Sequence, residues 1–266
     1  MIKKIISGGQ TGADQAALDT AIKWNISHGG WVPRGRLTEA GRLPDKYDMQ
    51  EMPTSSYSAR TEQNVIDSEG TLIISHGPLT DGSKHTKEMA IKHEKPFIHI
   101  NLNNEADSSR AAEHAHEWIT KSKIEMLNVA GPRSSNDPSI YQAVMHILTI
   151  IIVMDFIEIK TSPSQTKLPL RPLSLDKAVN MISSRMSLRE RCYIANMVKA
   201  ELIYLDITLG DYIRKTFGMN SGHEDLLQEC REILGRNDIT DNDAVNVIIT
   251  ELWKRLRETH AMRIVK

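Results

Sequence analysis

Cysteine is scarce in this sequence. Only Cys192 and Cys230 occur among 266 residues, and each lies in a segment with a helical pattern. Two isolated cysteines cannot form a disulfide framework or a CxxC metal pair, so we expect both to be small buried apolar side chains. The sequence also has no HExxH motif, and His114 and His116 would point apart on a helix because they are two residues apart. We predict no metal held by protein ligands.

Long apolar segments and a dominant charge are missing as well. The most apolar run, residues 147–157, includes Thr149 and Asp155 and is too short to span a bilayer. The amino-terminal segment MIKKIISGGQTG reaches glycine too early to hold the apolar region of a signal peptide. The 33 basic and 34 acidic residues give a net charge of -1, which provides no general attraction to nucleic acid or to a membrane. We therefore expect a cytoplasmic protein with neither of these partners.

The chain is expected to form two domains, because one domain takes roughly 150 residues and the composition changes near residue 160. Residues 160–173 (KTSPSQTKLPLRPL) contain three prolines among polar residues, and we predict that they form a linker. Eleven of the 15 glycines and eight of the ten histidines lie at or before residue 160. Because glycine-rich loops allow close approach of a ligand, we place a ligand-binding domain at 1–159 and a helical domain at 174–266.

The first domain alternates short apolar strands with helical segments. The predicted strands are 2–7, 71–75, 96–100 and 126–130, and the predicted helices are 14–24, about 86–92 and 140–156. Repeated strand–loop–helix units are typical of an α/β fold, in which a parallel sheet has helices on both faces. Ligands of such sheets bind beyond the carboxyl ends of the strands. The second domain shows only helical apolar spacing, for example at Val245, Ile248 and Leu252, which predicts a small all-α bundle.

The first predicted strand is followed by the loop GGQTGAD, residues 8–14. Glycines let a backbone approach a ligand, and the amides at a helix start attract phosphate. The loop matches neither the Walker motif nor the dinucleotide motif, but side chains that can hydrogen-bond lie between its glycines. In the alternative interpretation it is a tight turn, with Asp14 as a charge at the helix start. The candidate ligand-binding residues of this loop are Gly8, Gly9, Gln10, Thr11, Gly12 and Asp14.

Two further segments contain candidate contacts for an anion. Arg34 and Arg36 in GGWVPRGR could clamp an anionic group with forked hydrogen bonds, although a solvated loop would explain both residues equally well. Arg60 and Asn64 are four residues apart and would share one helical face. Arg60 is a candidate phosphate contact, and Asn64 is a candidate for orienting a polar ligand. In the structural alternative, Arg60 pairs with Asp67 and holds its helix to the sheet.

Two later loops between a strand and a helix also carry glycine and hydroxyl groups. In HGPLTDGSKHTKEMA, Gly82, Ser83 and Thr86 form a second helix start suited to an oxyanion. In AGPRSSNDPSIY, Gly131 and Arg133 follow a strand, together with two serines. Because the carboxyl ends of parallel strands meet at one edge of a sheet, the three glycine-bearing loops predict a composite pocket for an anionic ligand.

The ordered motifs GGQTGADQAALD, GGWVPRGR, LPDKY, RTEQNVIDSEGTLII, DGSKHT, KPFIHI and NVAGPRSS resemble, over residues 1–157, the family named "putative molybdenum carrier". That family is similar to the molybdenum cofactor carrier proteins and to the Lonely Guy-type Rossmann-like proteins. The resemblance implies a Rossmann-like sheet, a homo-oligomer, and a phosphorylated small-molecule ligand. The implied function is carriage of the molybdenum cofactor (molybdopterin), or binding of a nucleotide, without catalysis.

The resemblance also raises an enzymatic alternative, because Lonely Guy enzymes cleave the base from nucleoside monophosphates. Their PGGxGTxxE motif corresponds here to DGSKHTKEM, in which Thr86 matches the threonine and Met89 replaces the glutamate. A phosphoribohydrolase would need Glu88, Asp67 or Asp14 in place of that glutamate, and the catalytic residues stay unassigned. In a third interpretation, the first domain senses a nucleotide and signals through the helical domain, which would otherwise serve oligomerisation or docking of a partner protein.

Overall fold

The computed structural model describes residues 1–157, 172–218 and 224–261. The chain divides into two compact units, Met1–Ile152 and Val153–Lys266, and each is described by itself. The boundary between them falls inside helix α5 (Ile140–Phe156). Most of the predicted linker at 160–173 lies outside the described residues.

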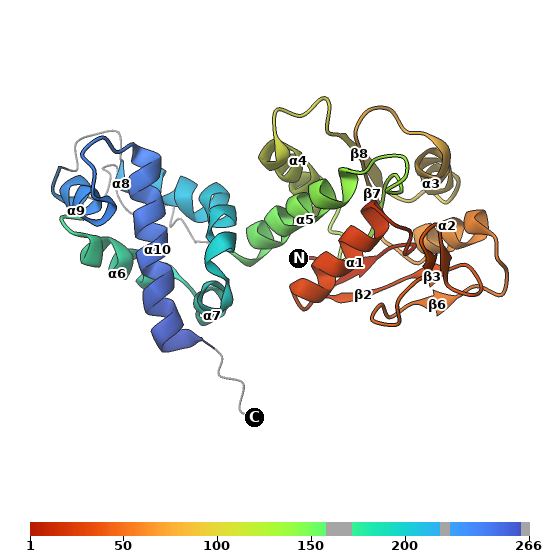
Figure 1. Ribbon diagram of the computed structural model, residues 1–266, viewed down its shortest axis with the longest axis horizontal. Helices are drawn as coiled ribbons and strands as arrows, with labels where there is room; N and C mark the ends of the chain where they lie inside the picture. The colour runs from red at the N-terminus through yellow and green to blue at the C-terminus, as the bar shows by residue number, and fades with distance from the viewer. Residues whose placement is uncertain (158–171, 219–223, 262–266) are drawn as a thin grey trace. The chain divides into compact units, whose positions relative to one another are not determined.

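The first unit contains a five-stranded parallel sheet (Figure 1). Its strands, in spatial order, are β2 (Ser27–Gly29), β1 (Lys4–Ile6), β9 (Met126–Ala130), β7 (Gly70–Ser75) and β8 (Phe97–Asn101). Strand β1 therefore lies inside the sheet, with Lys4 opposite Ser27 of β2 and opposite Met126 of β9. The four strands predicted from apolar runs are confirmed, whereas the short polar strand β2 was not predicted.

Strand β7 is buried at all six positions. Because alternate residues of a strand face opposite sides of the sheet, both faces must be covered. The covering helices of this unit are α1 (Ala13–Lys23), α2 (Tyr57–Ile66), α3 (Asp81–Lys92), α4 (Ser108–Lys121) and α5. The predicted α/β architecture, with a Rossmann-like parallel sheet, is confirmed, and α5 has the predicted bounds.

Two small ladders lie between β2 and α2, in a segment where no strand was predicted. Strand β3 (Trp31–Val32) pairs in parallel with β6 (Gln50–Glu51), and β4 (Leu37–Thr38) forms a hairpin with β5 (Gly41–Arg42). Arg36 holds this region together, because its buried guanidinium donates to the carbonyl oxygens of Leu43, Met49, Pro44 and Tyr47. The interpretation of Arg36 as an anion clamp is wrong, since a guanidinium with four protein acceptors has little capacity left for a ligand.

The second unit is helical in its described part, as predicted. It contains α6 (Leu175–Arg185), α7 (Leu188–Asn196), the short helices η1 (Lys199–Leu205) and η2 (Asp206–Gly210), α8 (Asp211–Phe217), α9 (Glu224–Leu234) and α10 (Asp241–His260). Its core includes the buried Trp253 of α10, whose indole donates to the carbonyl oxygen of Met197 at 2.9 Å. Of the two cysteines, Cys230 is buried as expected and Cys192 is only partly buried. No helix in the described residues is long and apolar enough to cross a membrane.

Candidate ligand-binding site

A cavity of about 170 Å³ lies at the carboxyl ends of β1, β9 and β7. One water needs about 10–15 Å³ of such space, so the cavity has room for a small ligand group. Its lining comes from the β1–α1 loop, helix α2, the start of α3 and the β9–α5 loop. The lining residues are Gln10, Asp14, Tyr57, Ser58, Arg60, Thr61, Thr80, Asp81, Gly82, Ser83, His85, Thr86, Ala130, Gly131, Pro132, Arg133 and Asn136. The prediction that the three glycine-bearing loops converge is confirmed.

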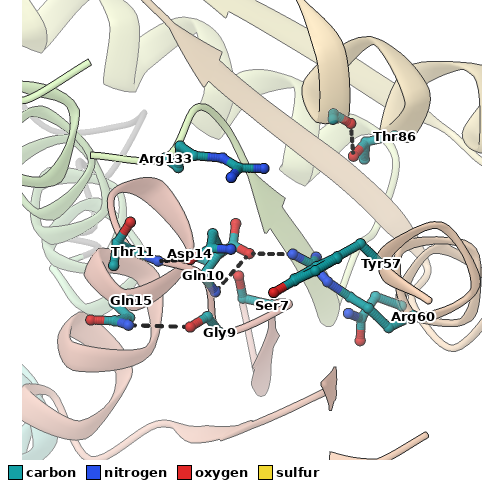
Figure 2. Close-up of polar contacts among 12 residues, drawn as sticks. Ser7, Gly9, Gln10, Thr11, Asp14, Gln15, Tyr57, Arg60, Thr86 and Arg133 are labelled. Atoms are coloured by element: carbon teal, nitrogen blue, oxygen red, sulfur yellow. Dashed lines mark hydrogen bonds and ion pairs between the residues drawn. The ribbon is translucent and has the colours of Figure 1, made fainter. Parts of the chain in front are cut away.

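Arg60 of α2 is the most buried cation of this lining, with 13% of its side chain exposed. Its Nη2 lies 3.4 Å from Oδ2 of Asp14 at the start of α1 (Figure 2). A Cβ atom on Gly8 would come within 1.7 Å of the Arg60 Nη1 atom, so glycine at this position gives the guanidinium its place beside β1. The Nε atom of Arg60 is buried and has no hydrogen-bond acceptor among the described residues. A buried donor without an acceptor is costly.

The pairing of Arg60 differs from the alternative drawn from the sequence. Asp67 accepts hydrogen bonds from Trp31 Nε1 and Gln63 Nε2, and the ion-pair partner of Arg60 is Asp14. Sequence spacing suggested Asp67 because it is near in the chain, whereas the sheet brings the β1–α1 loop alongside α2.

Asp14 is a buried carboxylate in the wall of the cavity. Burial raises its pKa, and Arg60, the amides of Gln10 and Gly8 and the Ser7 hydroxyl act in the opposite direction. Oδ2 of Asp14 accepts from the Gln10 amide at 3.2 Å. Asp14 is therefore more than a charge at a helix start, because it links the loop to Arg60.

The β1–α1 loop uses its donors within the protein, which corrects its interpretation as a phosphate cradle. The Gln10 amide binds Asp14, the Thr11 amide binds Gln10 Oε1, and the Ala13 amide binds the Pro132 carbonyl oxygen. Thr11 does not line the cavity; its hydroxyl accepts from the Ser134 amide and donates to Glu39. These bonds leave Gln10 and Asp14 as the residues of this loop that face the cavity.

The glycines of this loop and of the β9–α5 loop serve close packing of the two loops. At Gly12, where φ is 79°, a Cβ atom would lie 2.6 Å from the Pro132 carbonyl oxygen and 2.8 Å from the Ser134 amide. At Gly131 a Cβ atom would meet the Ile74 carbonyl oxygen at 2.4 Å. A Cβ atom on Gly9 would meet the side chains of Leu43 and Val32. A ligand was expected to lie against the backbone of these glycines. In the structure, other parts of the protein occupy that space.

The start of α3 is the part of the lining that resembles an open anion site. Its N-cap residue Thr80 makes no side-chain cap hydrogen bond, whereas Ser56 caps α2 and Asp107 caps α4. Gly82 has no atom within 4 Å of an added Cβ. An uncapped helix start presents amides and a positive dipole to the space in front of it.

Two other residues, Asp81 and Thr86, shape the first turn of α3. Asp81 has a positive φ of 40°, which is a strained backbone conformation for a residue with a side chain. Thr86 lies one turn into α3, where its hydroxyl donates to the Gly82 carbonyl oxygen at 2.9 Å. Helix α3 begins at Asp81, earlier than predicted, because glycine and serine gave a weak helical signal in this turn.

Arg34 and Asn64 are not part of the cavity lining. Arg34 is exposed, and the structure gives it one hydrogen bond, from its backbone amide to Thr54. Asn64 is 1% exposed, and its side-chain amide accepts from the Trp31 amide at 2.7 Å and donates to the Trp31 carbonyl oxygen at 3.1 Å. The role of Asn64 in orienting a ligand is therefore corrected to a structural one, since both of its polar atoms hold β3 against α2.

Replacing Asn64 by leucine is expected to lower the free energy of unfolding by about 1–3 kcal/mol, because the Trp31 amide and carbonyl lose their buried partner. The affinity for a ligand in the cavity should stay within about twofold of the parent. Chemical denaturation and calorimetric titration measure the two quantities on one preparation. A large loss of affinity in a folded variant would contradict the structural role.

Several lining residues were not foreseen. Tyr57, Ser58 and Thr61 lie on the same helix as Arg60, and the Ser58 hydroxyl lies 2.7 Å from His85 Nε2 of α3. Tyr57 is three residues from Arg60 and four from Thr61, which is a spacing that could have indicated a shared face. Without the sheet there was no reason to choose that face. Asn136 lines the cavity from the β9–α5 loop.

Of the three carboxylates considered for hydrolysis, Asp14 alone lines the cavity. Glu88 lies 3.8 Å from His85 Nδ1, with 54% of its side chain exposed, and is not among the lining residues. The described residues contain no group of three or more histidines, cysteines or acids that could hold a metal ion.

Comparison with known proteins identifies a family model and a similar crystal structure. The family model described as "Circularly permutated YpsA SLOG family" matches residues 5–152, more than half of the chain. A crystal structure at 1.45 Å described as "Putative molybdenum carrier protein" from Syntrophus aciditrophicus SB is 56% identical, with a TM-score of 0.56, and the match covers 57% of this chain and 95% of that one. None of the curated proteins matches. The resemblance found in the motifs is confirmed, and the chain belongs to the circularly permutated YpsA SLOG family.

Proposed function

We propose that the first unit binds an anionic, phosphorylated small molecule in the cavity between β1, α2, α3 and β9, and acts as its carrier. The observation that carries the proposal is the Arg60 guanidinium, a cation of the cavity wall with only 13% of its side chain exposed. Arg60 is paired with Asp14, so a ligand oxyanion would add to an ion pair already in place. Charge-assisted hydrogen bonds of this kind are the strong ones in proteins.

The rest of the lining supports the same class of ligand. Helix α3 starts at the cavity without a side-chain cap, and Arg133 adds a second cation from the β9–α5 loop. Hydroxyl and imidazole groups from α2 and α3 could bind other polar atoms of the ligand. The lining holds two carboxylates: Asp14 is paired with Arg60, and Asp81 is exposed to solvent, where its charge is screened.

We infer that the molybdenum cofactor (molybdopterin) or a nucleotide is the ligand. The similar protein from Syntrophus aciditrophicus carries the description of a molybdenum carrier, and both candidates present a phosphate group. A carrier needs no catalytic group, and its physical task is to bind the ligand tightly and exclude water from it.

The first test is mass spectrometry of small molecules released from anaerobically purified protein. We expect a pterin or its oxidation product, or a nucleotide, at close to one equivalent. In an Arg60→Met variant that circular dichroism shows to be folded, the occupancy should fall roughly 10- to 100-fold, because a hydrogen bond to a charged group contributes about 1.5–3 kcal/mol. Arg34→Met is the matched control, since it removes an arginine of the same unit that lies outside the cavity. Equal loss in both variants, or parent-like occupancy in Arg60→Met, would contradict the proposal.

A second candidate function is hydrolysis of a nucleoside monophosphate. The observation that favours it is the environment of Asp14. Asp14 is a buried carboxylate in the cavity wall with a raised pKa, and perturbed carboxylates are frequent in active sites. Water would add to the sugar C1′ as the bond to the base breaks, releasing free base and ribose 5-phosphate. Release of base by the parent, lost in Asp14→Asn with nucleotide binding retained, would favour the enzyme over the carrier.

A further inference from the structure

Glu39 lies in the turn of the β4–β5 hairpin, and its carboxylate reaches two loops that are distant in the sequence. Its Oε1 accepts from the Thr11 hydroxyl of the β1–α1 loop and from the Ser135 amide at 3.1 Å. Its Oε2 accepts from the Ser135 hydroxyl at 2.5 Å and lies 3.8 Å from Arg133 Nε. The Glu39 carboxylate thus interacts with two hydroxyl donors, one backbone amide and a guanidinium. Of the Glu39 side chain, 20% remains exposed.

This donor set is the kind that binds an oxyanion. Backbone amides, hydroxyl groups and arginine are the groups that bind phosphate and carboxylate in proteins. Partial burial opposes ionisation of Glu39, but the hydrogen bonds from Ser135 and Thr11 and the charge of Arg133 hold its pKa below the usual value. The surroundings therefore favour a negative charge at this point.

The hairpin that carries Glu39 has few other contacts with the body of the unit. Ala40, Gly41 and Arg42 are exposed, and an added Cβ on Gly41 would meet no atom within 4 Å. Near the turn, the Glu39 amide donates to Gln10 Oε1 at 2.9 Å, and Tyr57 donates to the Leu37 carbonyl oxygen at 3.3 Å.

The groups that hold this turn also face the candidate ligand. Gln10 and Tyr57 line the cavity, and so does Arg133. A ligand that engages these three residues would compete with the hairpin for the hydrogen bonds of Gln10 and Tyr57 and for the charge of Arg133. The hairpin and the cavity are thus coupled through shared residues.

We propose that Thr11, Arg133 and Ser135 form a second oxyanion subsite beside the cavity, for a phosphate group of the ligand, and that the Glu39 carboxylate occupies this subsite as a built-in competitor. The ligand class is then a molecule with two anionic groups, one near Arg60 and the start of α3 and one replacing Glu39. This specification rests on the proposed function for its first anionic group. The second subsite stands on its own contacts and is tested separately.

The test is titration with inorganic phosphate, followed by calorimetry and by ³¹P NMR for stoichiometry. The parent is expected to bind one phosphate near Arg60. Glu39→Ala should bind a second phosphate at least roughly tenfold more tightly than the parent does, because the competing carboxylate is gone. Glu51→Gln is the matched control: Glu51 also accepts a backbone amide, from Gly35 at 2.7 Å, but it is Glu39 that pairs with Thr11, Ser135 and Arg133. The Glu51→Gln protein should bind phosphate as the parent does.

Two further variants separate the proposals. Adding Ser135→Ala to Glu39→Ala should remove the gained phosphate and leave the first one. Adding Arg60→Met to Glu39→Ala should remove the first and leave the second. If Glu39→Ala is folded by circular dichroism yet gains no phosphate, the subsite is overturned whatever happens at Arg60. If phosphate binds at the subsite of Glu39→Ala but never near Arg60, the proposed function fails and the subsite stands.

Should Glu39→Ala not fold, Glu39→Gln gives the same test, because it keeps the size of the side chain and removes its charge. The second phosphate should again bind more tightly than in the parent. Parent-like phosphate binding in a folded Glu39→Gln protein would then overturn the subsite.

Discussion

Replacing Gly12 by alanine is expected to lower the free energy of unfolding of the first unit by about 2–6 kcal/mol. Two effects add. The backbone conformation of Gly12, φ 79° and ψ -125°, is one that residues with a side chain avoid, at a cost of about 1–3 kcal/mol. The new Cβ would also lie within 2.8 Å of two backbone atoms of the β9–α5 loop, and overpacking of this kind costs about 1–3 kcal/mol. Because those atoms belong to the main chain, they cannot rotate away as a side chain would.

Gly41→Ala is the matched control for the packing part of this effect. Gly41 also has a positive φ, of 100°, but an added Cβ would meet no atom within 4 Å. Only the conformational cost, about 1–2 kcal/mol, should appear. Denaturation followed by tryptophan fluorescence measures both variants, since Trp24, Trp31 and Trp118 all lie in the first unit. Equal losses in the two variants would show that the loop packing at Gly12 contributes nothing.

The second large effect is expected at the Arg60–Asp14 pair. Removing one partner of a buried ion pair costs about 3–5 kcal/mol, because the other charge stays buried without compensation. Arg60→Met keeps most of the side-chain length and removes the charge. The side chains of Arg60 and Asp14 are 13% and 6% exposed, so this variant should be strongly destabilised at neutral pH. Much of the loss should be recovered in the double variant Arg60→Met with Asp14→Asn, in which no buried charge is left.

The loss in Arg60→Met should depend on pH. Burial raises the pKa of Asp14 in the folded chain, and Arg60 opposes that rise, so without Arg60 the pKa rises further. A raised pKa in the folded state means that stability is fully present below the unfolded pKa of about 3.9 and is lost as the pH rises through the folded pKa. The difference in stability between parent and variant should therefore shrink as the pH falls toward 4. A difference that stays constant from pH 7 to pH 4 would contradict this account, and Arg34→Met should show no such dependence.

Apolar runs were sufficient to predict the sheet, because a fully buried strand such as β7 has the same signal whatever its neighbours are. The bounds of helix α5 were predicted because its sequence is also strongly apolar. Strand β2 has no such signal, since its sequence is Ser-His-Gly, and it exists because β1 offers a free edge. The hairpin at Leu37–Arg42 was missed because Arg36, Glu39 and Gln10 hold it through side-chain contacts, which sequence periodicity does not report.

The candidate site was predictable in its location but not in its chemistry. Three glycine-bearing loops after parallel strands must meet at one edge of the sheet, and they do. The function of each glycine could not be predicted, because close approach of a ligand and close approach of another loop require the same absent Cβ. At Gly12 and Gly131 the protein itself fills that space. The partner of Arg60 was missed because Asp14 is close only after folding.

The position of β1 has a consequence for synthesis of the chain. This amino-terminal strand pairs with β9, whose residues are made more than one hundred positions later. The emerging chain can pair β1 with β2 early, but the other side of β1 must wait for residues 126–130 to leave the ribosome. The three loops that surround the cavity can therefore assemble only when nearly all of the first unit has been made. Ligand capture is thus deferred until translation has passed this strand, and any earlier nascent chain exposes an unpaired strand edge that chaperones would have to shield.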